Sequence, residues 1–182
     1  MTTDNQTGTS TLRTREDLAK FFAEKGYTHG AEIGVLGGSY SIKLMDANPK
    51  LKMYCVDTWQ RPGKWEEANI RLKGYNCELI RKRSLEAVHG FNNGTLDFVY
   101  IDASHIFDDV MRDIIEWTPK VRQGGIVAGH DYDNAPGNAV KDAVDMYVKW
   151  HFRELNILPE PSGKWITRSG QPSNAITWWF YA

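Results

Sequence analysis

The chain has 182 residues, of which 41% are hydrophobic and 25% charged, and its formal net charge is -1. This length suits one domain with an ordinary core, and the near-neutral charge gives no general attraction to nucleic acid or to a membrane surface. No apolar run approaches the length of a membrane span, and the polar first eleven residues lack the apolar core of a signal peptide.

Cys55 and Cys77 both lie in apolar, strand-like runs. We therefore expect reduced core thiols, with neither a disulfide nor a zinc site, and a cytoplasmic protein. The polar N-terminal stretch predicts a flexible tail over residues 1–12, followed by a single domain over residues 13–182.

Short apolar runs alternate with amphipathic stretches along most of the chain. The first stretch predicts a helix over residues 14–25, because Thr14 can cap it, Asp17 sits at the capping-box position and Gly26 ends it. The apolar runs that predict strands cover residues 31–35, 51–56, 77–80, 96–101 and 126–128. The helical patterns that follow them cover residues 39–47, 64–73, 84–90, 106–120 and 138–151.

Two further β-like runs, at residues 165–167 and 175–181, predict a C-terminal antiparallel pair. Five alternations of strand and helix before that pair predict an α/β fold. We expect a doubly wound, mostly parallel, Rossmann-like sheet with helices on both faces and the antiparallel pair at its end. In such folds ligands bind at the carboxyl ends of the strands, where the strand order reverses.

The most informative segment is the glycine-rich stretch over residues 31–41, which leads from the first strand into a helix. Glu32 stands two residues before Gly34, and Gly38 follows four residues later. This spacing differs from the dinucleotide fingerprint, and a carboxylate beside the loop suits a cationic or hydroxyl-bearing ligand better than a pyrophosphate. The alternative is a plain tight turn, since glycine often marks turns.

Polar residues also stand where the other predicted strands end. Each acid alone could be a helix cap, because aspartate is favoured there. Their gathering at one rim of the sheet instead favours a ligand site. The residues at this rim are Glu32, Asp57, Ser84, Asp102, His130 and Asp131.

Three motifs, over residues 32–41, 96–105 and 124–132, resemble those of class I S-adenosylmethionine-dependent methyltransferases. The similarity is to the small-molecule O-methyltransferase branch, with catechol O-methyltransferase, macrolide-sugar O-methyltransferases and the cephalosporin-hydroxylase group as relatives. It extends roughly from Glu32 to Tyr147. The resemblance implies S-adenosylmethionine as cofactor, with Asp57 accepting from the ribose, Trp59 covering the adenine and Ser84 at the adenine edge. The cofactor residues that it implies are Glu32, Gly34, Gly38, Asp57, Trp59, Ser84 and Asp102.

The same resemblance implies a divalent cation after the fourth and fifth strands, held at Asp102, His130 and Asp131. Mg²⁺ prefers oxygen ligands, so the histidine departs from the family pattern. This leaves Mg²⁺, Mn²⁺, Fe²⁺, Zn²⁺ or no metal as open alternatives.

His105 lies three residues after Asp102, at the position of the lysine general base of catechol O-methyltransferase. A histidine there suits removal of a proton from a hydroxyl group. The alternative is a local hydrogen bond at a helix start. The candidate catalytic residues are therefore His105, Asp102 and His130.

The function that these features predict is methyl transfer to a small-molecule acceptor, at a hydroxyl group, with or without a metal. One alternative is metal-dependent oxidation, in which His105, His130 and either Asp102 or Asp131 hold Fe²⁺. Another is a non-catalytic cofactor-binding module. The segment over residues 60–75 is the candidate lid, and the small size suggests a homodimer that completes the pocket.

Overall fold

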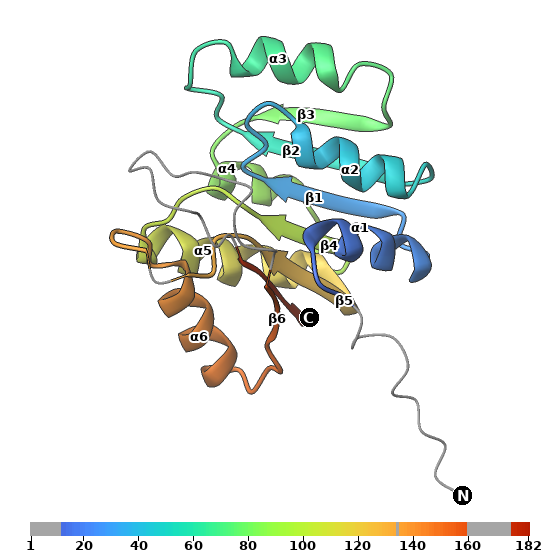
Figure 1. The fold of residues 1–182 in the computed structure, drawn as a ribbon. Helices are drawn as coiled ribbons and strands as arrows, with labels where there is room; N and C mark the ends of the chain where they lie inside the picture. Colours follow the sequence, from blue (N-terminus) through green and yellow to red (C-terminus); the bar gives the residue numbers. More distant parts are fainter. Residues whose placement is uncertain (1–11, 134, 160–175) are drawn as a thin grey trace, which may run out of the picture.

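The computed structural model describes residues 12–133, 135–159 and 176–182. Within them, one sheet of seven strands has the order β3-β2-β1-β4-β5-β7-β6 (Figure 1). Strands β1 to β5 run parallel, whereas β7 is antiparallel to both β5 and β6. The strands are β1 (His29–Ile33), β2 (Lys52–Asp57), β3 (Cys77–Arg81), β4 (Leu96–Ile101), β5 (Val121–Gly129), β6 (Asn156–Pro159) and β7 (Ile176–Tyr181). The predicted doubly wound α/β fold is confirmed.

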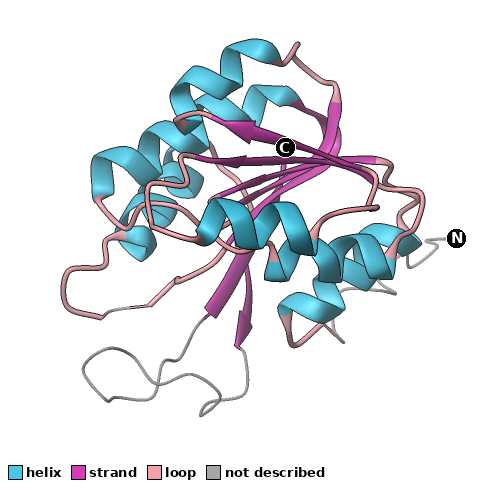
Figure 2. Ribbon diagram, turned by 90° about the horizontal axis from the view of Figure 1, so that it is seen from above, coloured by secondary structure: helices cyan, strands magenta, loops and turns pink. Residues whose placement is uncertain are grey.

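Helices cover both faces of this sheet (Figure 2). One buried cluster joins the first three helices to side chains such as Phe98 and Tyr100, and a second joins the later helices to neighbours such as Val99 and Ile101. Because successive strand residues point to opposite faces, β4 supplies both clusters. The helices are α1 (Arg15–Glu24), α2 (Ser39–Ala47), α3 (Lys64–Arg71), α4 (Ser84–Ala87), α5 (Phe107–Trp117) and α6 (Val140–Trp150), with short 3-10 turns η1 (Val88–Gly90) and η2 (Thr118–Lys120).

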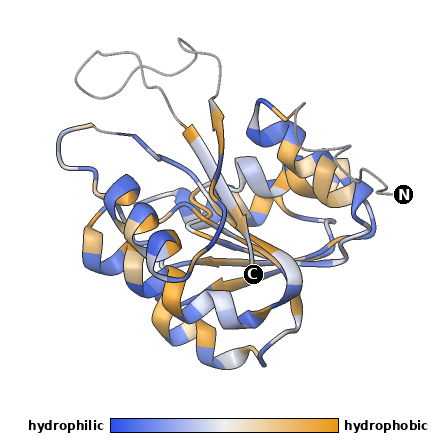
Figure 3. Ribbon diagram, turned by 90° about the horizontal axis from the view of Figure 1, so that it is seen from below, coloured by the Kyte–Doolittle hydropathy of each residue, from blue (hydrophilic) through white to orange (hydrophobic). Residues whose placement is uncertain are grey.

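Residue hydropathy follows these layers (Figure 3), with apolar residues concentrated along the strands and mixed with polar ones on the helices. Helix α1 begins as predicted, since Thr14 and Asp17 form a capping box. Leu12, at the end of the predicted tail, is partly buried against the core, and residues 1–11 lie outside the described part. None of the helices in the described residues is long and apolar enough to cross a membrane.

Strands β1 and β5 begin two or more residues before their predicted positions, and one strand was not predicted. Strand β1 lies two residues earlier than expected, because Gly34 takes a φ of +94° and ends the extended run. Strand β5 begins five residues earlier, at Val121, and Gly124, with φ +72°, lies at a shift in its register with β4. The strand paired with β7 is β6, which the sequence reading missed. The predicted run at residues 165–167 lies outside the described residues.

The order of the strands fixes where a ligand can bind. The chain runs from β1 outward to β3, then returns to place β4 on the other side of β1. The order therefore reverses between β1 and β4, and loops that leave their carboxyl ends diverge to opposite faces. Of the predicted site residues, Gly34, Asp102, His130 and Asp131 follow β1, β4 and β5 at this edge. Glu32 lies within β1, Asp57 ends β2 and Ser84 follows β3.

Candidate active site

The glycine loop after β1 is shaped by its contact with the end of β4. A Cβ at Gly34 would stand 2.0 Å from the carbonyl oxygen of Asp102, so only glycine fits there. Leu36 takes a left-handed φ of +52°, and its N–H donates to Asp57 Oδ2 over 2.8 Å. The indole Nε1 of Trp59 donates to the Leu36 carbonyl (2.7 Å). The loops after β1 and β2 therefore hold one another.

Helix α3, in the predicted lid segment, docks on the other side of this loop. Arg71 donates from Nη1 to the Gly37 carbonyl (3.2 Å) and to Ser39 Oγ (2.5 Å). Its Nη2 lies 2.8 Å from Glu67 Oε1, which fixes the guanidinium. Sequence reasoning missed Arg71. The only signal available was the spacing of Lys64, Glu67 and Arg71 on one helical face.

Glu32 lies beneath the loop and is only 2% exposed. Ser41 Oγ, on α2, donates to its carboxyl group. Burial raises the pKa of Glu32 to about 8, against this hydrogen bond. A cationic ligand at the loop would favour the ionised form, because an opposite charge lowers a carboxyl pKa. Contact between Glu32 and the cationic or hydroxyl-bearing ligand expected from the sequence stays a prediction.

The predicted nucleoside residues are engaged within the chain. Asp57 accepts from Leu36 N and, at Oδ1, from Trp59 N (2.7 Å), which leaves the second lone pair of each oxygen for a ligand. The Trp59 ring is 3% exposed and packs edge-on against Trp65 at 4.8 Å. It is therefore part of the core wall, and its role over an adenine ring stays a prediction.

Ser84 begins α4, but its hydroxyl faces α5. It donates to Asp113 Oδ1 and accepts from Trp117 Nε1 (2.8 Å). A contact between this hydroxyl and an adenine edge would compete with both bonds, so Ser84 as a cofactor residue stays a prediction. The buried Asp113 was not singled out from the sequence, because its surroundings depend on how α4 and α5 pack.

A cluster of acids and histidines gathers at the ends of β4 and β5. Asp131 joins two of its members: His105 Nε2 lies 3.0 Å from Asp131 Oδ2, and His130 Nδ1 lies 3.2 Å from Asp131 Oδ1. Asp131 has a left-handed φ of +57°, and Asn138 donates to its carbonyl (2.7 Å). The indole Nε1 of Trp178, on β7, donates to the His130 carbonyl (3.2 Å).

Charge in this cluster is strongly perturbed. Although burial opposes it, hydrogen bonds from His105 and His130 hold the pKa of Asp131 far below its ordinary range. Its hydrogen bond raises the pKa of His105 in return. Burial works against the charged form of His130, but its bond to Asp131 outweighs this and raises its pKa. Burial also raises the pKa of Asp102.

A small hollow, open to solvent, lies beside this cluster. His130 is 8% exposed, and its Nε2 is buried without a hydrogen-bond partner among the described residues. The polar wall includes Asp102, His105, His130 and Asp131, and the apolar wall includes Val110, Val140 and Trp178.

The side chains that could hold a divalent cation differ by one residue from the predicted set. Ligand atoms of Asp102, His105 and Asp131 lie within 4.8 Å of one another. This group contains His105 and not His130, although both rings lie against Asp131, and His130 as a ligand stays a prediction. Two carboxylates and one imidazole fit Mn²⁺, Fe²⁺ or Zn²⁺ better than Mg²⁺. The group lacks the second histidine that the oxidation alternative requires.

Fold and site together define a class I methyltransferase, and comparison with known proteins places the chain more closely. Residues 31–132, more than half of the chain, match a family model described as a methyltransferase domain. The chain therefore belongs to this methyltransferase family, which confirms the class expected from the motifs. An uncharacterised protein, y4gI of Sinorhizobium fredii, is 31% identical over 88 residues. These are 43% of this chain, which spans about a tenth of that relative's length.

Solved structures agree on the fold. The O-methyltransferase of Bacillus cereus in complex with SAH has a TM-score of 0.69 at 14% identity, over 98% of this chain and 85% of that one. Cofactor-bound Rv0187 from MTB has a TM-score of 0.70 at 17% identity, over 100% of this chain and 82% of that one. Precorrin-6y C5,15-methyltransferase of Geobacter metallireducens has a TM-score of 0.68 at 14% identity, over 95% of this chain and 91% of that one. Because the identity to this chain is 17% or less in each case, the likeness shows the fold alone.

Proposed function

We propose that the chain transfers the methyl group of S-adenosylmethionine to a hydroxyl group of a small molecule, at the carboxyl ends of β1, β4 and β5. The observation that carries this proposal is the Asp131 carboxylate paired with His105 beside the pocket, next to the glycine loop that packs on Asp102. The cofactor side is assigned to Glu32, Gly34, Gly38, Asp57, Trp59, Ser84 and Asp102.

The reaction needs alignment and removal of one proton. The acceptor oxygen attacks the methyl carbon in line with the departing sulfur, so an O–C bond forms, the S–C bond breaks and S-adenosylhomocysteine leaves. His105 takes the hydroxyl proton, and Asp131 orients its ring and stabilises the imidazolium that results. The apolar wall of Val110, Val140 and Trp178 holds the rest of the acceptor.

Metal assistance is the second form of this proposal, and the grouping of Asp102, His105 and Asp131 favours it. A bound divalent cation would lower the pKa of the acceptor hydroxyl. In that case His105 holds the ion, and His130, which bonds to Asp131, orients a ligand. A homodimer and a cytoplasmic location stay predictions.

Calorimetric titration with S-adenosylmethionine and S-adenosylhomocysteine, with and without Mn²⁺ or Mg²⁺, tests the cofactor and the metal separately. We expect one site for each nucleoside. Asp57→Ala should weaken both by about 1.5–3 kcal/mol, or roughly 10- to 100-fold, because a charged acceptor is lost. Failure of the unaltered chain to bind either nucleoside contradicts the proposed function. Equal affinity in Asp57→Ala contradicts the ribose assignment.

The metal form has its own readout. We expect Mn²⁺ to bind in the presence of S-adenosylhomocysteine, and Asp131→Asn to abolish this while leaving nucleoside affinity nearly intact. Crystals soaked in Mn²⁺ with the nucleoside bound should show an anomalous peak within bonding range of Asp102 or Asp131. A map with no such peak leaves His105 as a metal-independent base.

A further inference from the structure

Arg15, the first residue of α1, lies beside the glycine loop although it is distant from it in sequence. The capping box of Thr14 and Asp17 fixes where the helix begins. The guanidinium carbon of Arg15 lies 5.1 Å from the centroid of the Tyr40 ring, and the Tyr40 hydroxyl donates to the Arg15 carbonyl (2.9 Å). Tyr40 is two residues past Gly38, so Arg15 is held at the first turn of α2.

The same ring leads toward the end of β4. Tyr40 contacts Tyr100 with centroids 4.4 Å apart, and Tyr100 stands two residues before Asp102. Both tyrosines are buried, so they form a fixed support under the guanidinium. These ring contacts therefore connect Arg15, at the start of α1, to the last residues of β4.

Electrostatics at three strand ends agrees with this placement. Burial raises the pKa of Glu32 and of Asp102, and the charge of Arg15 works against both shifts. The same charge disfavours protonation of His130, whose pKa is set mainly by burial and its bond to Asp131. The charge of Arg15 thus acts on residues from β1 and from the ends of β4 and β5.

The ligand chemistry that fits such an arginine is a carboxylate. The methionine portion of S-adenosylmethionine carries an ammonium and a carboxylate on one carbon. Glu32 lies beneath the glycine loop and suits the ammonium. A guanidinium fork matches a carboxylate in two parallel hydrogen bonds.

We propose that Arg15 binds the carboxylate of the methionine portion of the cofactor, with the Tyr40 ring holding its guanidinium in place. This inference rests on the proposed function, since it needs that cofactor. It assigns a binding residue to α1, which lies outside the matched family segment of residues 31–132.

Two ligands that differ only in the amino-acid portion provide the test. S-adenosylhomocysteine carries the carboxylate, whereas 5′-methylthioadenosine has the same nucleoside and thioether without it. Arg15→Met should weaken S-adenosylhomocysteine about 10- to 100-fold, the usual effect of a lost charged hydrogen bond, and leave 5′-methylthioadenosine within about twofold. In Arg15→Lys the affinity for S-adenosylhomocysteine should lie between those of the unaltered chain and Arg15→Met, because an ammonium keeps the charge but cannot form the two parallel hydrogen bonds of a guanidinium.

Arg13→Met is the matched control, since it removes the same charge two residues away, and we expect it to change neither affinity. If the unaltered chain binds neither ligand, the proposed function fails. If it binds both and Arg15→Met weakens both equally or neither, the inference about the carboxylate is overturned. Arg15→Lys keeps the test decisive if Arg15→Met does not fold, because a carboxylate-binding arginine still predicts a selective loss.

Discussion

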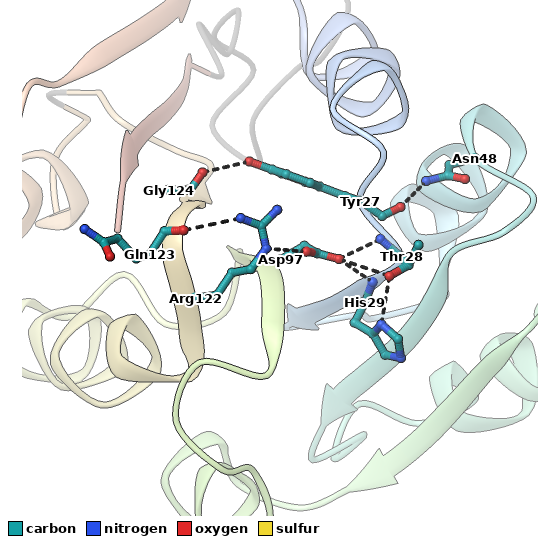
Figure 4. Close-up of polar contacts among 8 residues, drawn as sticks. All are labelled: Tyr27, Thr28, His29, Asn48, Asp97, Arg122, Gln123 and Gly124. Carbon is teal, nitrogen blue, oxygen red and sulfur yellow. Dashed lines mark hydrogen bonds and ion pairs between the residues drawn. The ribbon is translucent and has the colours of Figure 1, made fainter.

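The carboxyl groups at the amino ends of the strands differ from those at the carboxyl ends in their hydrogen bonding and in the direction of their pKa shifts. At the amino ends, Asp97 on β4 accepts from Thr28 N (2.6 Å), His29 N (2.9 Å) and Arg122 Nε (2.7 Å), and Figure 4 shows these donors converging on one carboxylate. The Arg122 guanidinium also lies over the Tyr27 ring at 5.2 Å. Although burial opposes it, these bonds hold the pKa of Asp97 below its ordinary value.

At the carboxyl ends, Glu32 is buried and Asp102 is half-buried, and the pKa values of both carboxyl groups are raised. There, His130 Nε2 is buried without a partner among the described residues. Buried groups that lack partners cost free energy unless a ligand or function uses them. The amino ends are thus built for stability and the carboxyl ends for a ligand. The expected outcomes below test this difference.

The largest effect is expected at His105. His105→Ala should reduce methyl transfer about 10²- to 10⁴-fold, the usual contribution of general acid–base catalysis. The measurement is transfer of labelled methyl to a panel of small hydroxylated acceptors. His29→Ala, at the amino ends, is the control and should leave turnover unchanged. Equal losses in the two variants would contradict the comparison.

Gly34→Ala should be the most destabilising glycine change. The new Cβ would meet the Asp102 carbonyl oxygen at 2.0 Å, and the residue would keep a φ of +94°. Strain and overpacking together predict a loss of order 3 kcal/mol in the free energy of unfolding. Gly74→Ala is the control: its φ is +91°, with nothing within 4 Å, so about 1 kcal/mol is expected. Urea unfolding that gives equal losses rules out the packing argument.

Asp97→Ala should lower stability by about 2–3 kcal/mol, because two backbone N–H groups and Arg122 lose their acceptor. S-adenosylhomocysteine affinity should not change. A variant that keeps its stability but loses the nucleoside would reverse the roles of the two ends.

Asp113 gives a smaller effect that depends on pH. Burial raises its pKa to about 6, against the bond from Ser84. A carboxyl with a raised folded-state pKa is stabilising below its unfolded pKa of about 3.9, and this is lost as pH rises through about 6. Stability should therefore fall between about pH 4 and 6 through this group. Asp113→Asn should remove that slope and add about 2 kcal/mol at pH 7. Melting curves of both proteins at a series of pH values test this prediction. If the stability of Asp113→Asn falls with pH as steeply as that of the unaltered chain, other groups cause the pH dependence.

The carboxyl end was the more predictable part from sequence, and the reason is local. Gly34, Asp57 and Asp102 each follow an apolar run, so parallel strands bring them to one edge whatever the helices do. Strand β6 was missed because it is four residues long and is defined by its pairing with β7. The two glycines before residue 126 indicated a break, but they form an irregularity inside β5.

Residues that come from the helices could not be predicted in the same way. Arg15 and Arg71 reach the glycine loop only through the docking of α1 and α3, which depends on side-chain packing across the sheet face. The choice between His105 and His130 beside the two acids likewise depends on ring directions. The sequence predicts that both histidines follow the ends of β4 and β5. It does not predict which imidazole nitrogen lies near Asp102.

A crystal structure of the chain with S-adenosylhomocysteine tests the central claim most directly. The account predicts density for the nucleoside at the carboxyl ends of β1 and β2. The ribose hydroxyls should lie within hydrogen-bond distance of Asp57, and the sulfur should face the pocket bounded by Asp102, His105 and Asp131. Density for the nucleoside elsewhere on the chain, with this edge of the sheet left unchanged, would contradict it.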